Sequence, residues 1–286
     1  MTTPKILAMI YSKLLTTLYG LRFGPPVETP EAEAAALVLI ADGVGGFELT
    51  SFGLRHVVGQ GGGPELVRAV PWGHGWGRWH ADLTNIPNQR AGARAVADRV
   101  LAWREAHPDR PAYLVGKSGG TGIAVGALEL LPAGSVEAAF LLAAALSPTY
   151  DLTRALRAVG REIVAFWSPL DVIILGAGTW LFGTMDRVHS VGAGLVGFRP
   201  PDDLDAAGRA LYAAKLRQVR WTPEMVASGH LGGHAGTDNP AFLRRYILPL
   251  LRAGAANPAP EPPRGSSPPP AASINPSVGA TTPGPP

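Results

Sequence analysis

The chain has 286 residues, of which 46% are hydrophobic and 16% are charged. So apolar a chain cannot be disordered over most of its length, and the length fits one domain with appendages. It contains no cysteine, which excludes disulfides, thiolate metal sites and a cysteine nucleophile. The net charge of +3 comes without a dense basic run, so we expect no nucleic-acid partner.

Residues 1–34 are expected to hold an amphipathic helix followed by a linker. Apolar residues recur at helical spacing between positions 5 and 22. Lys13 interrupts the middle of this run, which argues against a transmembrane helix, and no signal-peptide pattern is evident. Two interpretations remain: the helix packs on the domain, which we favour, or residues 5–22 make a peripheral membrane contact. We expect a cytoplasmic protein, membrane-associated in the second case.

Residues 35–252 alternate short apolar runs with helical patterns, which indicates one α/β domain. The runs cover 36–41, 66–70, 112–115, 138–143 and 162–167, with a weaker one at 216–221. Helical periodicity is clearest at 89–106, 121–131 and 238–251. Runs that are apolar at nearly every position suit parallel strands buried on both faces. We therefore predict a mainly parallel, doubly wound sheet with helices on both faces and a ligand site at the carboxyl ends of the strands.

Residues 253–286 hold 11 of the 28 prolines and only two sizeable apolar residues. Such a segment cannot bury enough surface to offset the entropy lost on ordering. We expect a disordered, partly polyproline tail, and we disfavour the alternative of a ligand for a proline-recognition module.

Gly116, Ser118 and Gly120 form a Gly-x-Ser-x-Gly motif between the apolar run at 112–115 and a helical pattern. The motif requires a strand before it and a helix after it, because a tight turn holds the serine side chain exposed. The letters Gly-Lys-Ser also suggest a phosphate-binding loop, but Pro111 stands where that motif needs a glycine. Ser118 is therefore a candidate nucleophile.

With this motif in its strand-to-helix context, residues 35–252 resemble the α/β-hydrolase superfamily of serine hydrolases. The resemblance implies a Ser–His–Asp triad in the chain order serine, acid, histidine, together with an oxyanion hole. It also implies acyl-transfer chemistry that needs no cofactor.

The resemblance places one oxyanion N–H in the loop after the run at 36–41 and another on the residue after the nucleophile. Val44, or else Gly43, and Gly119 are the candidate donors. Members of the superfamily often carry His-Gly at the start of this loop, whereas this chain has Asp42-Gly43, which leaves the first donor open.

The resemblance implies that the acid of the triad follows a late strand. Asp171 stands a few residues after the run at 162–167. Its role would be to orient the histidine and to stabilise its charged form. Asp151 and Asp186 are rivals, but neither directly follows an apolar run.

The histidine should precede the last helix, and both His230 and His234 do. We favour His234 because it stands a short loop before the helix cap, and we expect His230 nearer the strand end or solvent. Two histidines four residues apart also suggest a zinc site on a helix. Gly232 and Gly233 argue against a helix between them, so we predict no metal.

Two further segments surround the expected site. Residues 172–198 form a long apolar excursion, interpreted either as a lid or as ordinary packing. The loop after the run at 66–70 is rich in aromatic residues, which either line an apolar pocket or seal the loop. These residues are Trp72, His74, Trp76, Trp79 and His80. Asp82, beside them, is expected to be solvated.

These patterns favour a serine hydrolase that cleaves an ester or related acyl compound. The nucleophile would be Ser118, the base His234 and the acid Asp171, with a small, apolar acyl substrate as partner. The alternative is a catalytically inactive α/β-hydrolase-like binding or scaffold protein. The patterns leave the oligomeric state open.

Overall fold

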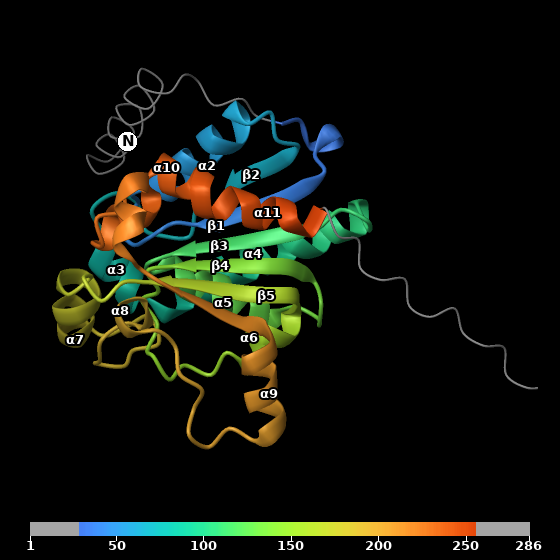
Figure 1. The fold of residues 1–286 in the computed structure, drawn as a ribbon. Helices are drawn as coiled ribbons and strands as arrows, with labels where there is room; N and C mark the ends of the chain where they lie inside the picture. The colour runs from blue at the N-terminus through green and yellow to red at the C-terminus, as the bar shows by residue number, and fades with distance from the viewer. Residues whose placement is uncertain (1–28, 256–286) are drawn as a thin grey trace, which may run out of the picture.

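A computed structural model describes residues 29–255 of the chain. The helix expected at 5–22, its membrane contact and nearly all of the expected tail lie outside these residues. Within the described part, six strands form one sheet in the order β2-β1-β3-β4-β5-β6, and every neighbouring pair is parallel. Helices cover both faces of the sheet (Figure 1), so the predicted α/β class is confirmed.

Each apolar run of the sequence is a strand. The strands are β1 (Ala36–Ala41), β2 (Glu65–Ala69), β3 (Ala112–Lys117), β4 (Val136–Leu142), β5 (Val159–Trp167) and β6 (Leu216–Arg220). Every residue of β1 and β3 is buried, as expected for strands with helices on both sides. β6 is an edge strand with no fully buried residue, which explains why its sequence is less apolar.

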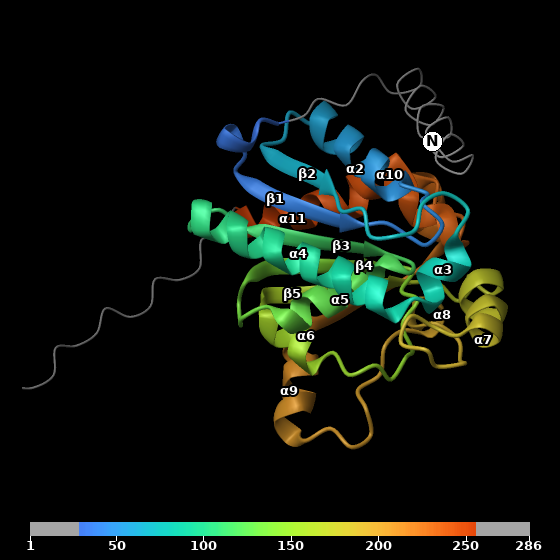
Figure 2. The ribbon, with the colours of Figure 1, turned by 180° about the vertical axis from the view of Figure 1, so that it is seen from behind.

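Alternate side chains of the strands enter two separate hydrophobic cores. Leu37 and Leu39 of β1 pack on the face covered by α4 (Ile86–Ala106) and α5 (Gly120–Leu130). Val38 and Ile40 pack on the other face, under α2 (Leu49–Gln60) and the C-terminal helix. Figure 2 shows α4 and α5 in front of the sheet when the molecule is seen from behind. The sheet is therefore wound on both sides, as predicted.

The C-terminal helix differs at both ends from the prediction of 238–251. It runs through α10 (Pro240–Phe242), a π-helical turn (Leu243–Ile247) and α11 (Leu248–Ala255). Proline suits its first position, and Asn239 Oδ1 accepts the N–H of Ala241 at 2.9 Å. The helix continues to residue 255, so residues 253–255 belong to it and not to the tail.

The sequence patterns did not indicate several other helices. These are α2, α3 (Trp79–Thr84), α6 (Thr153–Ala158) and α9 (Ala206–Lys215). α2 carries two glycines, and α3 and α6 are too short to show a helical period.

The segments that carry the expected site residues meet at the carboxyl ends of the strands. The excursion after β5 contributes a π-helical turn (Ile173–Gly178), α7 (Thr179–Phe182) and α8 (Ala193–Val196). Both views place α3, α7 and α8 at this edge of the sheet (Figures 1 and 2). Among the described helices, none combines the length and the hydropathy that a membrane span requires.

Candidate active site

Ser118 occupies a tight turn between β3 and α5, with its backbone at φ 51°. Two glycines make this turn sterically possible. A Cβ on Gly116 would lie 2.7 Å from Thr121 Cα, and one on Gly120 would collide with the carbonyl of Ala41. Ser118 N donates to Leu142 O at 2.9 Å, which fixes the turn against β4. The spacing of the motif thus follows from close backbone packing.

A chain of two hydrogen bonds joins Ser118 to a histidine and an aspartate. His234 begins a 3-10 turn, η4 (His234–Asp238), and its Nε2 lies 2.9 Å from Ser118 Oγ. His234 Nδ1 donates to Asp171 Oδ2 at 2.6 Å. Asp171 is buried in the turn after β5, where its N–H donates to Ser168 O. The structure therefore brings together the three side chains that the sequence suggested.

The surroundings of His234 favour its neutral form. Burial lowers the pKa of His234 from its ordinary value, and the positive charge of Lys117 lowers it further, while Asp171 opposes both effects. Because Nδ1–H points at Asp171, the lone pair of Nε2 faces the Ser118 hydroxyl. This tautomer can accept a proton from Ser118 at neutral pH.

His230 lies beside Trp221 at the end of β6, which is one of its two expected environments, and Trp221 Nε1 donates to His230 O at 2.8 Å. Its ring is buried, not near solvent, and it packs edge-on against Phe242 with centroids 5.1 Å apart. Its Nδ1 accepts the N–H of Gly232 at 3.2 Å, and the backbone of Gly236 lies against the ring. Burial, followed by the charge of Lys117, lowers the pKa of His230 to about 4. His230 therefore serves as a neutral packing residue of the loop that carries His234.

Lys117 is a buried cation at the variable position before the serine of the motif. Because any residue can stand at that position, the motif did not indicate a role for Lys117. Its Nζ donates to His234 O at 2.5 Å and to Thr237 Oγ1 at 3.0 Å, and lies 3.7 Å from Asp238 Oδ2. Asp238 Oδ1 in turn accepts from Thr50 Oγ1 of α2 at 2.6 Å. These contacts fix the histidine loop to the end of β3. A lysine at the end of a buried strand was the signal that could have identified this role.

The loop after β1 lies directly over the serine. A Cβ on Gly43 would meet the Ser118 Cβ at 3.3 Å, and Val44 N lies 3.6 Å from the Cβ position of Gly119. Within residues 29–255, the N–H groups of Val44 and Gly119 have no acceptor. Two free N–H donors beside a serine oxygen are suited to binding an oxyanion.

Asp82 is fully buried, so the expectation that it is solvated was wrong. Its Oδ2 accepts the N–H of Gly45 at 2.7 Å, and its Oδ1 accepts the N–H of His74 at 2.6 Å. His74 Nδ1 also lies 2.8 Å from Oδ1. The carboxylate thereby joins the loop after β2 to the loop after β1, which carries Val44.

Asp42 fixes the other side of the same loop. Its Oδ1 accepts the N–H groups of Thr50 and Ser51 at the start of α2, at 3.0 and 3.2 Å, and the Ser51 hydroxyl contacts Oδ2. Burial raises the pKa of Asp42 from 3.8 to about 7, against the opposing effect of these hydrogen bonds. Trp72 is buried and donates to Asp42 O at 2.8 Å, so it seals the loop.

The rival acids and the remaining aromatics have other partners. Asp151 accepts from the N–H and hydroxyl of Thr153, the first residue of α6, and Asp186 accepts from the N–H and hydroxyl of Ser147. Trp79 is exposed and meets Phe182 of α7 edge-on, with centroids 5.0 Å apart. Within residues 29–255, no group of three or more metal-binding side chains is assembled.

The strand order, the sharp serine turn and the histidine after the last strand decide the fold. It is an α/β-hydrolase fold. No family model matches the chain, and no curated protein matches it. Solved structures of this fold align with it at low identity.

Three of these structures illustrate the likeness. Esterase PE8 is 16% identical, with a TM-score of 0.43 over 78% of this chain and 97% of its own. A Trichoderma reesei cutinase with a phosphonate inhibitor is 15% identical, with a TM-score of 0.38 over 86% and 87%. RedJ, a thioesterase of the prodiginine pathway of Streptomyces coelicolor, is 18% identical, with a TM-score of 0.37 over 78% and 97%.

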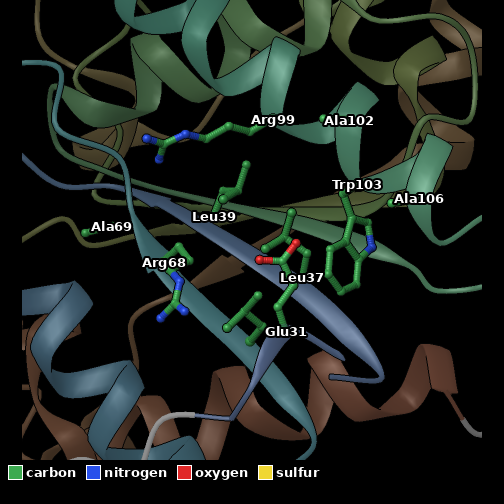
Figure 3. Close-up of a pocket in the computed structure, with 10 residues that line it drawn as sticks. Glu31, Leu37, Leu39, Arg68, Ala69, Arg99, Ala102, Trp103 and Ala106 are labelled. Atoms are coloured by element: carbon green, nitrogen blue, oxygen red, sulfur yellow. The ribbon is translucent and has the colours of Figure 1, made fainter. Parts of the chain in front are cut away.

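A hollow lies apart from the Ser118 site, between α4 and the β1–β2 edge (Figure 3). It has a volume of about 630 Å³ and an apolar floor that includes Leu37, Leu39 and Trp103. Its polar residues are Arg68, Arg99 and Glu31, the last from a 3-10 turn, η1 (Glu31–Glu33). Ser118 does not line this hollow.

Proposed function

We propose that the protein is a serine hydrolase that cleaves an ester or related acyl compound through an acyl-enzyme. The observation that carries this proposal is the pair of hydrogen bonds that joins Asp171, His234 and Ser118. Nucleophile, base and orienting acid stand in hydrogen-bond contact in that order, which is the arrangement that activates a serine hydroxyl.

In the first half of the reaction, Ser118 Oγ attacks the substrate carbonyl carbon while its proton passes to His234 Nε2. The negative charge that develops on the carbonyl oxygen is stabilised by the N–H groups of Val44 and Gly119. Asp171 stabilises the imidazolium through Nδ1. The carbon–oxygen bond to the leaving group then breaks, and His234 Nε2 gives its proton to the departing alkoxide.

In the second half, water repeats the sequence on the acyl-enzyme. Its proton passes to His234 Nε2 as its oxygen attacks the ester carbon, and the same two N–H groups bind the oxyanion. Collapse of this intermediate releases the acid, and the Ser118 oxygen recovers the proton from Nε2. The cycle needs no group beyond the side chains and backbone named here.

The side chains over the serine turn support an apolar acyl group as substrate. Met185 is buried, its side chain lies against Gly119 and Gly122, and Val44 contacts Gly119 from the opposite loop. An apolar chain placed here would lose contact with water as it binds.

A fluorophosphonate probe tests the proposal directly. The full-length protein should be labelled, Ser118→Ala should not, and Ser135→Ala should label like the wild type. Ser135 is a suitable control because it is also buried but donates to Pro132 O, in the turn before β4. Failure of the folded wild type to react would overturn the proposal and favour the non-catalytic binding protein.

A further inference from the structure

Most of the large apolar side chains that are exposed in the described structure gather at the carboxyl edge of the sheet. Six of them define what we call the apolar surface: Trp79, Val172, Ile173, Trp180, Leu181 and Leu231. The exposed fraction reaches 75% for Ile173, 71% for Leu231 and 65% for Trp180. Monomeric soluble proteins rarely expose large contiguous apolar patches, so a patch of this kind usually marks an interaction site.

The members of the apolar surface belong to separate segments that meet in space. Trp79 of α3 contacts Phe182 at the end of α7, and Figures 1 and 2 both show these two helices together. On the other side, Leu170 lies against Gly232, the residue after Leu231. Val172 directly follows Asp171. The apolar surface therefore borders the Ser118 site on the side of the excursion and the histidine loop.

The exposed charged residues in the loops after β1 and β2, the excursion and the histidine loop are basic, whereas exposed Glu224 lies farther along the same edge, after β6. No charged residue occurs from 172 to 185, the stretch that forms the exposed π-helical turn and α7. In the segments 42–48, 71–85, 168–199 and 229–238, the exposed charged residues are Arg78, Arg187 and Arg199. The acids of these segments are buried or half-buried. An apolar centre with a basic border is complementary to an anionic lipid surface.

We propose that the apolar surface docks on an anionic lipid surface, with the Ser118 site facing the lipid. Ile173, Trp180 and Leu181 enter the boundary between headgroups and acyl chains, while Arg78 and Arg187 meet the headgroups. The docking proposal is argued only from exposed side chains. Its consequence, that the hydrolase takes substrate from the lipid, also rests on the proposed function.

Vesicle co-sedimentation of the full-length protein tests the docking. Wild type should sediment with phosphatidylcholine vesicles that contain phosphatidylglycerol, and less with pure phosphatidylcholine vesicles. Ile173→Glu with Trp180→Glu should lower the bound fraction about tenfold or more, because charge is costly at this boundary. The matched control, Leu101→Glu with Leu130→Glu, alters exposed apolar residues of α4 and α5 and should bind like wild type.

Three outcomes would overturn the docking proposal. In the first, wild type stays in the supernatant. In the second, the double variant still sediments, which would assign binding to another segment such as residues 5–22. In the third, the double variant turns a dimer into a monomer on a sizing column without altering vesicle binding, which would make a second copy the occupant.

Hydrolysis of a soluble short-chain ester separates this inference from the proposed function. Activity that depends on Ser118 and persists in the double variant leaves the hydrolase standing when docking fails. Absence of that activity in wild type removes the hydrolase, while vesicle binding continues to report on the apolar surface.

Discussion

Replacing Asp82 tests whether its buried carboxylate positions the loop after β1, which carries the proposed oxyanion donor Val44. Asp82→Ala removes the acceptors of Gly45 N–H and of His74 N–H, whose bonds measure 2.7 and 2.6 Å. Asp82→Asn keeps the size of the side chain but leaves only one oxygen for the two donors, which approach opposite oxygens of the carboxylate. In either variant at least one buried N–H loses its partner.

The structure sets the size of the expected effect. A buried donor without an acceptor costs about 1–3 kcal/mol, so Asp82→Ala should lose about 2–5 kcal/mol and Asp82→Asn about half of that. For a domain of this length, each kcal/mol lowers Tm by about 2–4 °C. If Gly45 no longer holds Val44 in place, loss of one oxyanion donor should reduce kcat by about 10²-fold. KM should change little, because the donor acts on charge that develops only in the transition state.

Thermal unfolding and steady-state hydrolysis of a p-nitrophenyl ester measure both effects. Asp151→Asn is the control, since it alters a carboxylate that accepts from Thr153 at the start of α6. A folded Asp82→Ala protein that kept kcat within threefold of wild type would refute the reasoning. So would equal losses of kcat in the Asp82 and Asp151 variants.

Three further predictions address the histidines and the buried charges. His234→Ala should lower kcat by about 10³-fold or more, whereas His230→Ala should cost tenfold at most and chiefly lower Tm; the reverse ranking of kcat would exchange the two roles. Lys117→Met should shift the acid limb of the profile of kcat/KM against pH to higher pH, because the lysine charge lowers the pKa of His234; an unmoved limb would contradict this. Burial raises the pKa of Asp42 to about 7, so wild-type stability should fall by about 4 kcal/mol as pH rises from about 4 to above 7. Denaturant unfolding of Asp42→Asn should show no such fall, since the amide reproduces the protonated form; a parallel fall would assign it to other groups.

Local patterns were enough to predict the sheet and the sharp turn that carries Ser118. Strands buried on both faces must be apolar at nearly every residue, so β1 and β3 are visible as continuous runs. Only glycine fits at positions 116 and 120, so the serine turn leaves a trace in the sequence itself. The weak run at 216–221 marks β6, whose exposed edge needs fewer apolar residues. The strands and the serine turn leave a local pattern in the sequence, because each depends on burial of a whole segment or on contacts between residues close in sequence.

The tertiary structure alone decided where His230 lies and which buried charges support the site. His230 and His234 stand in the same glycine-rich loop, and only the fold turns one ring into the core and the other toward Ser118. Asp82 and Lys117 look like surface residues in sequence, because charged side chains usually are. Their partners lie 37 residues away at Gly45 and 117 residues away at His234. Burial of a charge depends on such distant partners, and no local pattern records them.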